Sequence, residues 1–385
     1  MKIGIVTMVG NSNYGNILQN FAVQKIIEEL GFDACTLNND TSTCGIVNQK
    51  HNKFSGKYVK RYISSYMFTK YGCKNERDYK AFSVINKIKN KKLFVKSFRE
   101  REKKLKNFRY AHINYNPNPV DSDDFLNELN QYFAFVCGSD VVWHPTYHKN
   151  KDADFLGFAP EFRRIAFAPS FGVSNILERT RRDEYSKWIN GIDYLSVRDE
   201  SGHKIIKDLT GRESVVLMDP TLCVNASEWR SLAVEPKNKP EGEFCLCYFL
   251  GNMTKEYEKY IKKNASGKDL VYICDVQDIK HYATGIEELL WLIDNASMMF
   301  TDSFHGVAFS LLLHTEFIAF ERVEEGLDLF TRIESLLNMT NLEKRKYGSD
   351  LVSIDFSKSD AIICERRLFM INYLKQSLES IGNCF

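Results

Sequence analysis

Long hydrophobic runs are missing from this sequence of 385 residues. The longest apolar stretch of its C-terminal half spans 306–313 and is followed by His314, whereas a membrane helix needs roughly 20 apolar residues. The apolar run at the start, residues 3–6, reaches Asn11 too soon to form the hydrophobic region of a signal peptide. We therefore expect a cytoplasmic protein without a membrane span.

Paired cysteine motifs are also missing, since none of the ten cysteines forms a C-x-x-C pair. Cys245 and Cys247 share one face of a predicted strand, but no His or second cysteine pair lies nearby at the spacing of a metal site. We expect no metal, and we interpret the cysteines of apolar segments as reduced core residues. These are Cys35, Cys137, Cys223, Cys245, Cys247 and Cys274.

The fingerprints of common nucleotide-binding loops do not occur either. The loop after the first predicted strand, residues 10–15, contains GNSNYG and does not match G-x-G-x-x-G. The pattern G-x-x-x-x-G-K-[ST] is absent from the whole sequence. Interpretations as a nicotinamide-dependent enzyme or a P-loop enzyme therefore lose support.

The chain is long enough for two domains, and its 44% of hydrophobic residues supply core material. Short apolar runs alternate with amphipathic segments almost throughout, which is typical of β-α-β units and parallel sheets. The polar stretch PKNKPEG at 236–242 indicates a linker. We expect Rossmann-like domains over 1–224 and 243–358, a linker over 225–242, and an amphipathic helix over 359–385 that crosses back onto the first domain.

A basic helical insertion is predicted over about 50–110 of the first domain. Residues 50–109 contain 20 Lys or Arg and four Asp or Glu, a difference of +16, while the whole chain carries +2. Aromatic residues recur there every four positions, at Tyr58, Tyr62 and Tyr66 and at Phe94 and Phe98. Such helices could contact an anionic membrane or acceptor, or they could pack on one face and be solvated on the other. Nucleic-acid binding is disfavoured, because no recognised module accompanies the charge.

Polar residues follow predicted strands of the first domain at the edge where α/β sheets bind ligands. The Gly- and Asn-rich loop at 10–15 leads into a helix, whose N-terminus favours an anion or sugar hydroxyls. An ordinary turn is the alternative. Asp140 follows a buried strand and is a candidate acid or base, although Ser139 or Asp140 could instead cap the next helix.

Two further strand ends carry cationic or titratable side chains. Arg198 follows a predicted strand and suits a carboxylate or phosphate, unless it pairs with Asp199 or Glu200. His305 lies between an apolar strand and the start of a helix, where Gly306 allows close backbone approach. A satisfied structural histidine is the alternative to a catalytic one.

Five segments, in this order, resemble the motifs of the polysaccharide pyruvyltransferase family. They are NYGNILQ at 13–19, GSDVVW at 138–143, APSFG at 168–172, SVRDESG at 196–202 and TDSFHG at 301–306. The resemblance implies an α/β fold similar to GT-B glycosyltransferases, with two Rossmann-like domains facing a cleft. It also implies transfer of a pyruvyl group from phosphoenolpyruvate to two hydroxyls of a sugar, in a polysaccharide or its lipid-linked precursor, to form a pyruvate ketal.

At the matching positions we expect His305 to be the acid/base, Arg198 to bind the donor carboxylate or phosphate, and Asp140 to orient or deprotonate the acceptor hydroxyl. The expected donor-binding residues are Arg198, Ser303, His305 and Gly306. The expected acceptor-binding residues are Asn13, Tyr14, Asn16, Ser139 and Trp143. Because Arg198 and His305 belong to different predicted domains, we expect domain closure to assemble the site. The reaction requires no metal, nicotinamide or nucleotide, and phosphoenolpyruvate is a substrate rather than a cofactor.

Three residues depart from the family motifs. Family members often have Gln after G-S-D and Asn after the Trp, where this chain has Val141 and His144. They also often have Arg two residues before the His, where this chain has Ser303. The cation that neutralises the donor phosphate is therefore open. A glycosyltransferase of the GT-B type that uses a nucleotide sugar, and a non-catalytic glycan-binding protein, are the alternatives.

Overall fold

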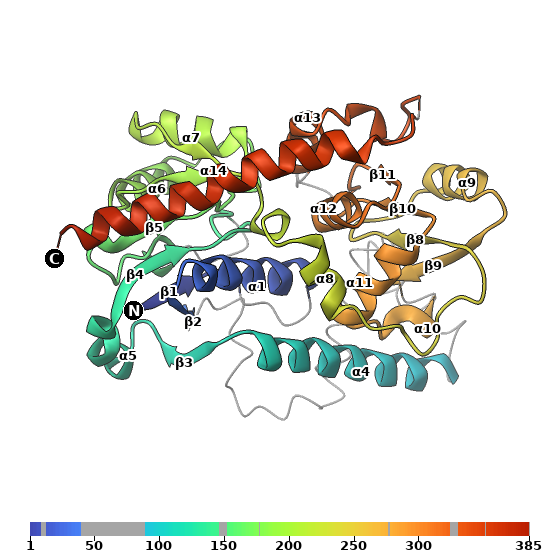
Figure 1. Ribbon diagram of the computed structural model, residues 1–385, viewed down its shortest axis with the longest axis horizontal. Helices are drawn as coiled ribbons and strands as arrows, with labels where there is room; N and C mark the ends of the chain where they lie inside the picture. The colour runs from blue at the N-terminus through green and yellow to red at the C-terminus, as the bar shows by residue number, and fades with distance from the viewer. Residues whose placement is uncertain are drawn as a thin grey trace.

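Two parallel β-sheets, one in each half of the chain, form the framework of the computed structural model (Figure 1). The structure describes residues 1–8, 13–39, 89–145, 152–176, 178–275, 278–323, 330–350 and 352–384. Most of the predicted basic insertion, including Tyr58, Tyr62 and Tyr66, lies outside the described residues.

The first sheet has the strand order β3-β2-β1-β4-β5, and all its neighbours are parallel. Its strands are β1 (Lys2–Val6), β2 (Asp33–Asn38), β3 (Tyr115–Pro119), β4 (Tyr132–Cys137) and β5 (Arg164–Ala166). The short parallel pair β6 (Ser196–Val197) and β7 (Val215–Val216) continues beyond β5 through a bridge between Ile165 and Tyr194. The central strands β1 and β4 are buried along nearly their whole length, as expected where helices cover both faces.

The second sheet has the order β11-β10-β8-β9 and is also parallel throughout. Its strands are β8 (Phe244–Tyr248), β9 (Asp269–Ile273), β10 (Met298–Thr301) and β11 (Phe317–Ala319). Parallel neighbours need crossover connections, and helices supply them in both halves. The predicted fold class, two Rossmann-like α/β domains, is confirmed. Cys245 and Cys247 are buried in β8, as predicted for core cysteines.

Helices connect the strands and cover the sheets. In the first half they are α1 (Tyr14–Glu29), α5 (Asp123–Glu128), α6 (Arg179–Asn190) and α7 (Glu200–Thr210). In the second half they are α9 (Lys255–Asn264), α10 (Ile279–Tyr282), α11 (Ile286–Asn295), α12 (Phe304–Leu313) and α13 (Phe330–Met339). Short 3-10 turns lie at Leu129–Gln131, Asp152–Phe155, Glu161–Arg163, Pro220–Leu222 and Glu343–Arg345.

The segment predicted as a linker, 225–242, contains a short helix, α8 (Ala226–Leu232). Its Trp229 is fully buried, with ring centroids 5.3 Å from Phe21 of α1 and 4.9 Å from Phe309 of α12. Because α1 and α12 belong to different halves of the chain, this tryptophan fills the space between them.

The C-terminal helix α14 (Phe356–Gly382) crosses from the second sheet back to the first, as predicted (Figure 1). Its 27 residues reach about 40 Å at about 1.5 Å per residue. Near its start Asp360 lies 3.0 Å from Nε2 of His314, at the end of α12. About two thirds of the way along, the hydroxyl of Tyr373 donates to the carbonyl oxygen of Ala166 in β5 at 3.1 Å.

A second long helix, α4 (Lys89–His112), also contacts both halves of the molecule. Its Phe94 packs against Tyr282 of α10 at 4.9 Å between ring centroids, and Phe108 packs against Phe21 of α1 at 5.9 Å. Phe94 and Phe98 are only 8% and 7% exposed. In this part of the basic segment, the aromatic side chains of Phe94 and Phe98 therefore pack against the protein and do not face a membrane.

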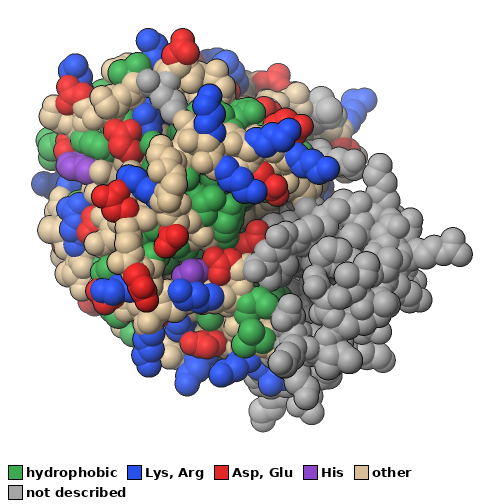
Figure 2. Space-filling view, turned by 90° about the vertical axis from the view of Figure 1, so that its right-hand side faces the viewer, with side chains coloured by type: hydrophobic (Ala, Val, Ile, Leu, Met, Phe, Trp, Pro, Cys, Tyr) green, Lys and Arg blue, Asp and Glu red, His purple; other side chains and the backbone are tan. Residues whose placement is uncertain are grey.

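Membrane contact through residues 50–88 stays a prediction, because those residues lie outside the described part of the chain. Within the described part, no helix combines the length and the apolar character that a bilayer span requires. Figure 2 shows the end of the molecule that carries α9 and α10, where Lys and Arg are interspersed with Asp and Glu over the described surface.

Tyr14 joins three elements at the boundary between the two halves. Its hydroxyl donates to the carbonyl oxygen of Thr284, before α11, at 2.6 Å and accepts from Nε of Arg101 on α4 at 3.1 Å. Tyr14 and Arg101 are 1% and 4% exposed. The side chain predicted to bind an acceptor therefore lies in a buried contact between the halves.

We expect Tyr14→Phe to lower the free energy of unfolding by about 1–3 kcal/mol, because it leaves a buried carbonyl and a buried guanidinium without the hydroxyl. Thermal and urea unfolding measure the change. Tyr110→Phe on α4 is the matched control, since Tyr110 is 62% exposed. Equal stability of the two variants would show that the contact contributes nothing.

Candidate active site

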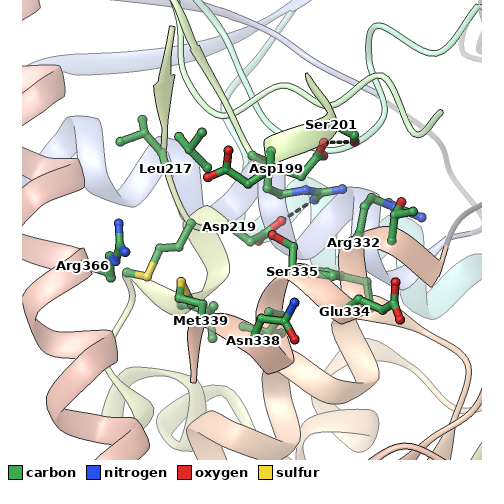
Figure 3. Close-up of a pocket in the computed structure, with 18 residues that line it drawn as sticks. Asp199, Ser201, Leu217, Asp219, Arg332, Glu334, Ser335, Asn338, Met339 and Arg366 are labelled. Atoms are coloured by element: carbon green, nitrogen blue, oxygen red, sulfur yellow. Dashed lines mark hydrogen bonds and ion pairs between the residues drawn. The ribbon is translucent and has the colours of Figure 1, made fainter. Parts of the chain in front are cut away.

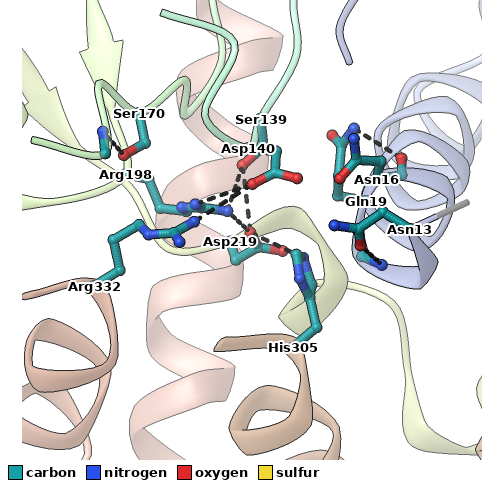
Figure 4. A network of polar contacts seen from close by, with 12 residues as sticks. Asn13, Asn16, Gln19, Ser139, Asp140, Ser170, Arg198, Asp219, His305 and Arg332 are labelled. Carbon is teal, nitrogen blue, oxygen red and sulfur yellow. Dashed lines mark hydrogen bonds and ion pairs between the residues drawn. The ribbon is translucent and has the colours of Figure 1, made fainter. Parts of the chain in front are cut away.

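A buried ion pair lies where β6 and β7 end (Figure 4). Arg198 directly follows β6, and Asp219 follows β7 after two further residues. Because β6 and β7 are parallel neighbours, both side chains emerge at the same edge of the sheet. Nη1 of Arg198 contacts Oδ2 of Asp219, and the two side chains are 2% and 0% exposed. The other carboxylate oxygen of Asp219 accepts from the backbone N–H and the hydroxyl of Thr221, at 3.0 and 2.7 Å.

Asp140 brings a second carboxylate to this pair from the end of β4. Its Oδ1 lies 3.5 Å from Nη2 of Arg198 and 3.5 Å from Nη1 of Arg332 on α13. The backbone of Asp140 has φ +70°, in the left-handed region that costs energy for a non-glycine residue. The neighbouring Ser139 hydroxyl donates to Asp219 at 3.4 Å. Two carboxylates and two guanidinium groups thus share one buried cluster.

His305 reaches the cluster from the second half of the chain. Ser303 caps α12, and His305 follows in the first turn of that helix. Its Nε2 lies 3.8 Å from Oδ2 of Asp219. The adjacent Phe304 ring lies 4.7 Å from the guanidinium of Arg198. Arg198 and His305 therefore both contact Asp219 in this structure, so the expected domain closure is not needed to bring them together.

Charge pairing decides the protonation states of the carboxylates. Burial would raise the pKa of Asp219, but Arg198 and His305 outweigh it, so this pKa lies below its ordinary value. Burial acts in the same way on Asp140, and Arg198, His305 and Arg332 lower its pKa below the ordinary value. Both carboxylates are therefore ionised at neutral pH.

The pKa of His305 lies below its ordinary value of 6.5, because burial disfavours the imidazolium more than Asp219 and Asp140 favour it. The imidazole is therefore neutral at pH 7 in the protein without a ligand. A neutral imidazole can accept a proton, and it can donate one after an added negative charge has raised its pKa.

The N-terminus of α1 faces this cluster from the other side of Asp140 (Figure 4). Asn16 is buried there, while Asn13 is exposed and accepts from the backbone N–H of Gly15 at 2.8 Å. Gln19 Nε2 donates to the Thr7 hydroxyl at 2.8 Å, and that hydroxyl donates to the carbonyl oxygen of Ser139 at 3.0 Å. A chain of hydrogen bonds thus connects α1 to the strand end that carries Asp140.

The structure brings together four of the predicted site residues, namely Ser139, Asp140, Arg198 and His305, and it places Asn16 near them. Trp143 lies elsewhere: it is fully buried, stacks on Phe155 at 4.8 Å, and its Nε1 donates to the carbonyl oxygen of Asp154. Gly306 allows α12 to pack on β10, since a Cβ there would lie 2.5 Å from Oγ1 of Thr301. Ser303 accepts from the N–H of Gly306 at 3.4 Å as a helix cap.

Two members of the cluster, Asp219 and Arg332, were not predicted from the sequence. Asp219 follows the apolar run at 215–218 and precedes Pro220, so it had the same strand-end signal as Asp140 and Arg198. Arg332 lies within a helix and carries no such signal. Among the described residues, no group of three His, Cys, Asp or Glu side chains is placed to hold a metal ion.

Gly15 and His305 pack so closely that a Cβ built on Gly15 would lie 2.1 Å from Nδ1 of the imidazole. We expect Gly15→Ala to cost about 1–3 kcal/mol of stability through this overlap, although Ala favours a helix over Gly. In a His305→Ala background the overlap is gone, so the same change should be neutral or stabilising. Urea unfolding of the four proteins measures this coupling.

Gly242→Ala serves as the control, because a Cβ at Gly242 meets no atom within 4 Å among the described residues. An equal cost of Gly15→Ala with and without the imidazole would contradict the packing described here.

Several solved structures are similar to this chain in their arrangement of helices and strands. The wall teichoic acid polymerase TagF is 9% identical, with 99% of this chain and 82% of that chain covered and a TM-score of 0.40. The spinosyn rhamnosyltransferase SpnG is 8% identical, with 99% and 96% covered and a TM-score of 0.36. The E. coli ADP-heptose lipopolysaccharide heptosyltransferase II is 10% identical, with 97% and 100% covered and a TM-score of 0.32.

A comparison with curated proteins gave no significant match. The family model described as polysaccharide pyruvyl transferase matches residues 13–322, a range that contains Asp140, Arg198, Asp219 and His305. Because this match covers most of the sequence, the chain belongs to the polysaccharide pyruvyl transferase family.

Proposed function

We propose that this protein transfers the pyruvyl group of phosphoenolpyruvate to two hydroxyls of one sugar, forming a pyruvate ketal and inorganic phosphate. The observation that carries the proposal is the meeting of a titratable imidazole, His305, with a buried guanidinium, Arg198, around Asp219. An acid/base beside a fixed cation is what an anionic enol substrate requires. Membership of the family supplies the class of reaction.

In the proposed reaction the methylene carbon of the donor takes up a proton and becomes a methyl group. The oxygen of one sugar hydroxyl forms a bond to C2, and the bond from C2 to the phosphate oxygen breaks, with its electron pair leaving on phosphate. The second hydroxyl then attacks C2 and closes the ketal. Of the two protons lost by the hydroxyls, one balances the proton gained by the methyl group and the other leaves with phosphate.

His305 is the proposed proton donor to the methylene carbon. Its pKa is below the ordinary value in the free protein, so it needs added negative charge to hold a proton at neutral pH. A bound phosphoenolpyruvate carries that charge in both its carboxylate and its phosphate. Binding of the donor thereby raises the pKa of His305 and provides the acid at the moment when it is needed.

Asp140 is the proposed group that orients or deprotonates the acceptor hydroxyl. Its carboxylate is ionised, lies at the end of β4 and faces the N-terminus of α1, where Asn16 offers an amide to a sugar hydroxyl. Arg198 is already in contact with Asp219 and Asp140, so it is held in position for the donor carboxylate. Because phosphoenolpyruvate is a cytoplasmic metabolite, we propose that the reaction takes place there, which fractionation of cells expressing the chain tests.

Incubation with phosphoenolpyruvate and a library of sugar acceptors should release inorganic phosphate only in the presence of a suitable acceptor. Phosphate release and the mass of the product measure the reaction, which adds a pyruvyl group to the sugar. Consumption of nucleotide sugars without use of phosphoenolpyruvate would overturn the proposal in favour of a glycosyltransferase. Binding of glycans without turnover of either donor would indicate a non-catalytic protein.

We expect His305→Gln to lower turnover by roughly a hundredfold or more, the scale for loss of a general acid/base, while the protein stays folded. In the unaltered protein, affinity for phosphoenolpyruvate should rise as the pH falls through neutrality, because the complex holds a proton that free His305 does not. Calorimetry at several pH values measures this slope. His305→Gln is the control, because the pH dependence of affinity that remains in this variant comes from titration of the donor's own phosphate. The same pH dependence in both proteins would contradict the role of His305.

A further inference from the structure

Arg332 is a buried cation outside every motif of the sequence. It lies on α13, beyond the end of the family match at residue 322, and is 8% exposed. Its contact with the site is the 3.5 Å approach of Nη1 to Oδ1 of Asp140. Asp140 shares that same oxygen with Arg198. Within this cluster, Arg332 therefore contacts one carboxylate oxygen, which Arg198 contacts as well.

Three nitrogen atoms of the cluster lack a hydrogen-bond partner among the described residues. They are Nε of Arg332, Nε of Arg198 and Nε2 of His305, and each is buried. Buried polar atoms are normally satisfied, so unsatisfied nitrogen atoms gathered in one place favour a bound ligand. Because guanidinium nitrogens can only donate, the missing ligand must supply acceptors.

The charge balance of the two arginines differs. Arg198 contacts Asp219 directly and Asp140 at 3.5 Å, and these carboxylates raise its pKa in spite of burial. Burial, and then repulsion by Arg198, lower the pKa of Arg332 to about 10. The positive charge of Arg332 is thus the less compensated of the two, and an anion beside it would relieve the imbalance.

A cavity of about 380 Å³ opens beside Arg332 (Figure 3). Arg198, Asp219 and Phe304 line it on the side of the cluster, and residues of α13 and Arg366 of α14 line it on the other. Its size is in the range of cavities that bind small ligands. Arg332 lines this cavity with two other cations, Arg198 and Arg366, and with four carboxylates, those of Asp199, Glu200, Asp219 and Glu334.

We propose that Arg332 binds the phosphate group of the donor and stabilises it as it leaves, an inference that rests on the proposed function. Ser303, where family members often have an arginine, caps α12 and offers no positive charge. Arg332 supplies that charge from a different helix. The phosphate, rather than the carboxylate, is its partner because the less compensated cation matches the more highly charged end of the donor.

The leaving group strengthens this assignment. When the bond from C2 to oxygen breaks, its electron pair adds negative charge to the phosphate. A guanidinium in a water-poor site stabilises that charge more than the charge of the intact donor. Arg332 should therefore affect turnover as well as donor affinity.

The test compares Arg332→Gln with Lys346→Gln. Lys346, which follows the 3-10 turn Glu343–Arg345, pairs with Glu334 of α13 at 2.6 Å, so its loss removes a cation that contacts this helix without touching Asp140. We expect Arg332→Gln to raise the KM for phosphoenolpyruvate by roughly 10- to 100-fold and to lower kcat. Arg332→Lys, which keeps the charge, should retain part of the affinity. Lys346→Gln should behave as the unaltered protein.

Inhibition by product-like anions shows which group Arg332 binds. Inorganic phosphate carries the leaving group, and pyruvate carries the carboxylate. We expect Arg332→Gln to weaken inhibition by phosphate and to leave inhibition by pyruvate unchanged. Weaker inhibition by pyruvate alone would overturn the assignment to phosphate, and an unchanged KM in a folded Arg332→Gln protein would overturn the role altogether.

Direct calorimetric binding of inorganic phosphate separates this inference from the proposed function. If the unaltered protein binds phosphate but does not use phosphoenolpyruvate, and Arg332→Gln loses that binding, the anion site stands and the donor is wrong. If the unaltered protein uses phosphoenolpyruvate and Arg332→Gln does so equally well, the proposed function stands and Arg332 is not part of it. If the unaltered protein binds neither inorganic phosphate nor phosphoenolpyruvate, both the role of Arg332 and the proposed function are overturned.

Discussion

The buried pair of Arg198 and Asp219 is the contact on which the rest of the site depends. Burial of two charges costs several kcal/mol for each ion, which only good pairing and further hydrogen bonds can offset. Thr221 supplies hydrogen bonds to Asp219, and Asp140 and the ring of Phe304 face Arg198. These partners come from the 3-10 turn after β7, the end of β4 and the start of α12, so satisfying one ion pair fixes the position of three segments. The pair therefore orients His305, which follows Phe304 on α12, as well as the guanidinium itself.

Two long helices hold the halves of the molecule in this arrangement. Helix α14 begins beside α12 and contacts β5 further along, while α4 packs on α10 and α11 at one end and on α1 at the other. Between them, Tyr14 connects α1 to Arg101 and Thr284. A hinge motion that separated the halves would have to break these contacts together. The cluster is thus already assembled in this structure, and the cavity beside Arg332 is lined in part by its members Arg198 and Asp219.

The fold could be predicted because its signal is local and repeated. Alternating apolar and amphipathic segments specify parallel sheets wherever they occur, and strand ends then mark the site, as at Asp140, Arg198 and His305. Strand β3 escaped prediction because YNPNP has two prolines, which only an edge strand such as this one tolerates. Arg332 escaped because a cation on an amphipathic helix usually faces solvent, and only the packing of α13 turns it inward. Tyr14, Asn16 and Trp143 all lie in family motifs, but a motif does not show which of its side chains are buried by packing. Tyr14 and Trp143 are buried in this way, whereas Asn16 lies near the cluster.

The contact of Gly15 with His305 explains why the first and last motifs belong together, although 290 positions separate them. Gly15 has no left-handed backbone to maintain, since it lies in the first turn of α1. Its missing side chain instead leaves room for an imidazole from the other half of the chain. Burial in this enclosure lowers the pKa of the imidazole below its ordinary value. The same enclosure lets a bound anion restore the proton, so one small residue in α1 helps to make the acid of the proposed reaction dependent on its substrate.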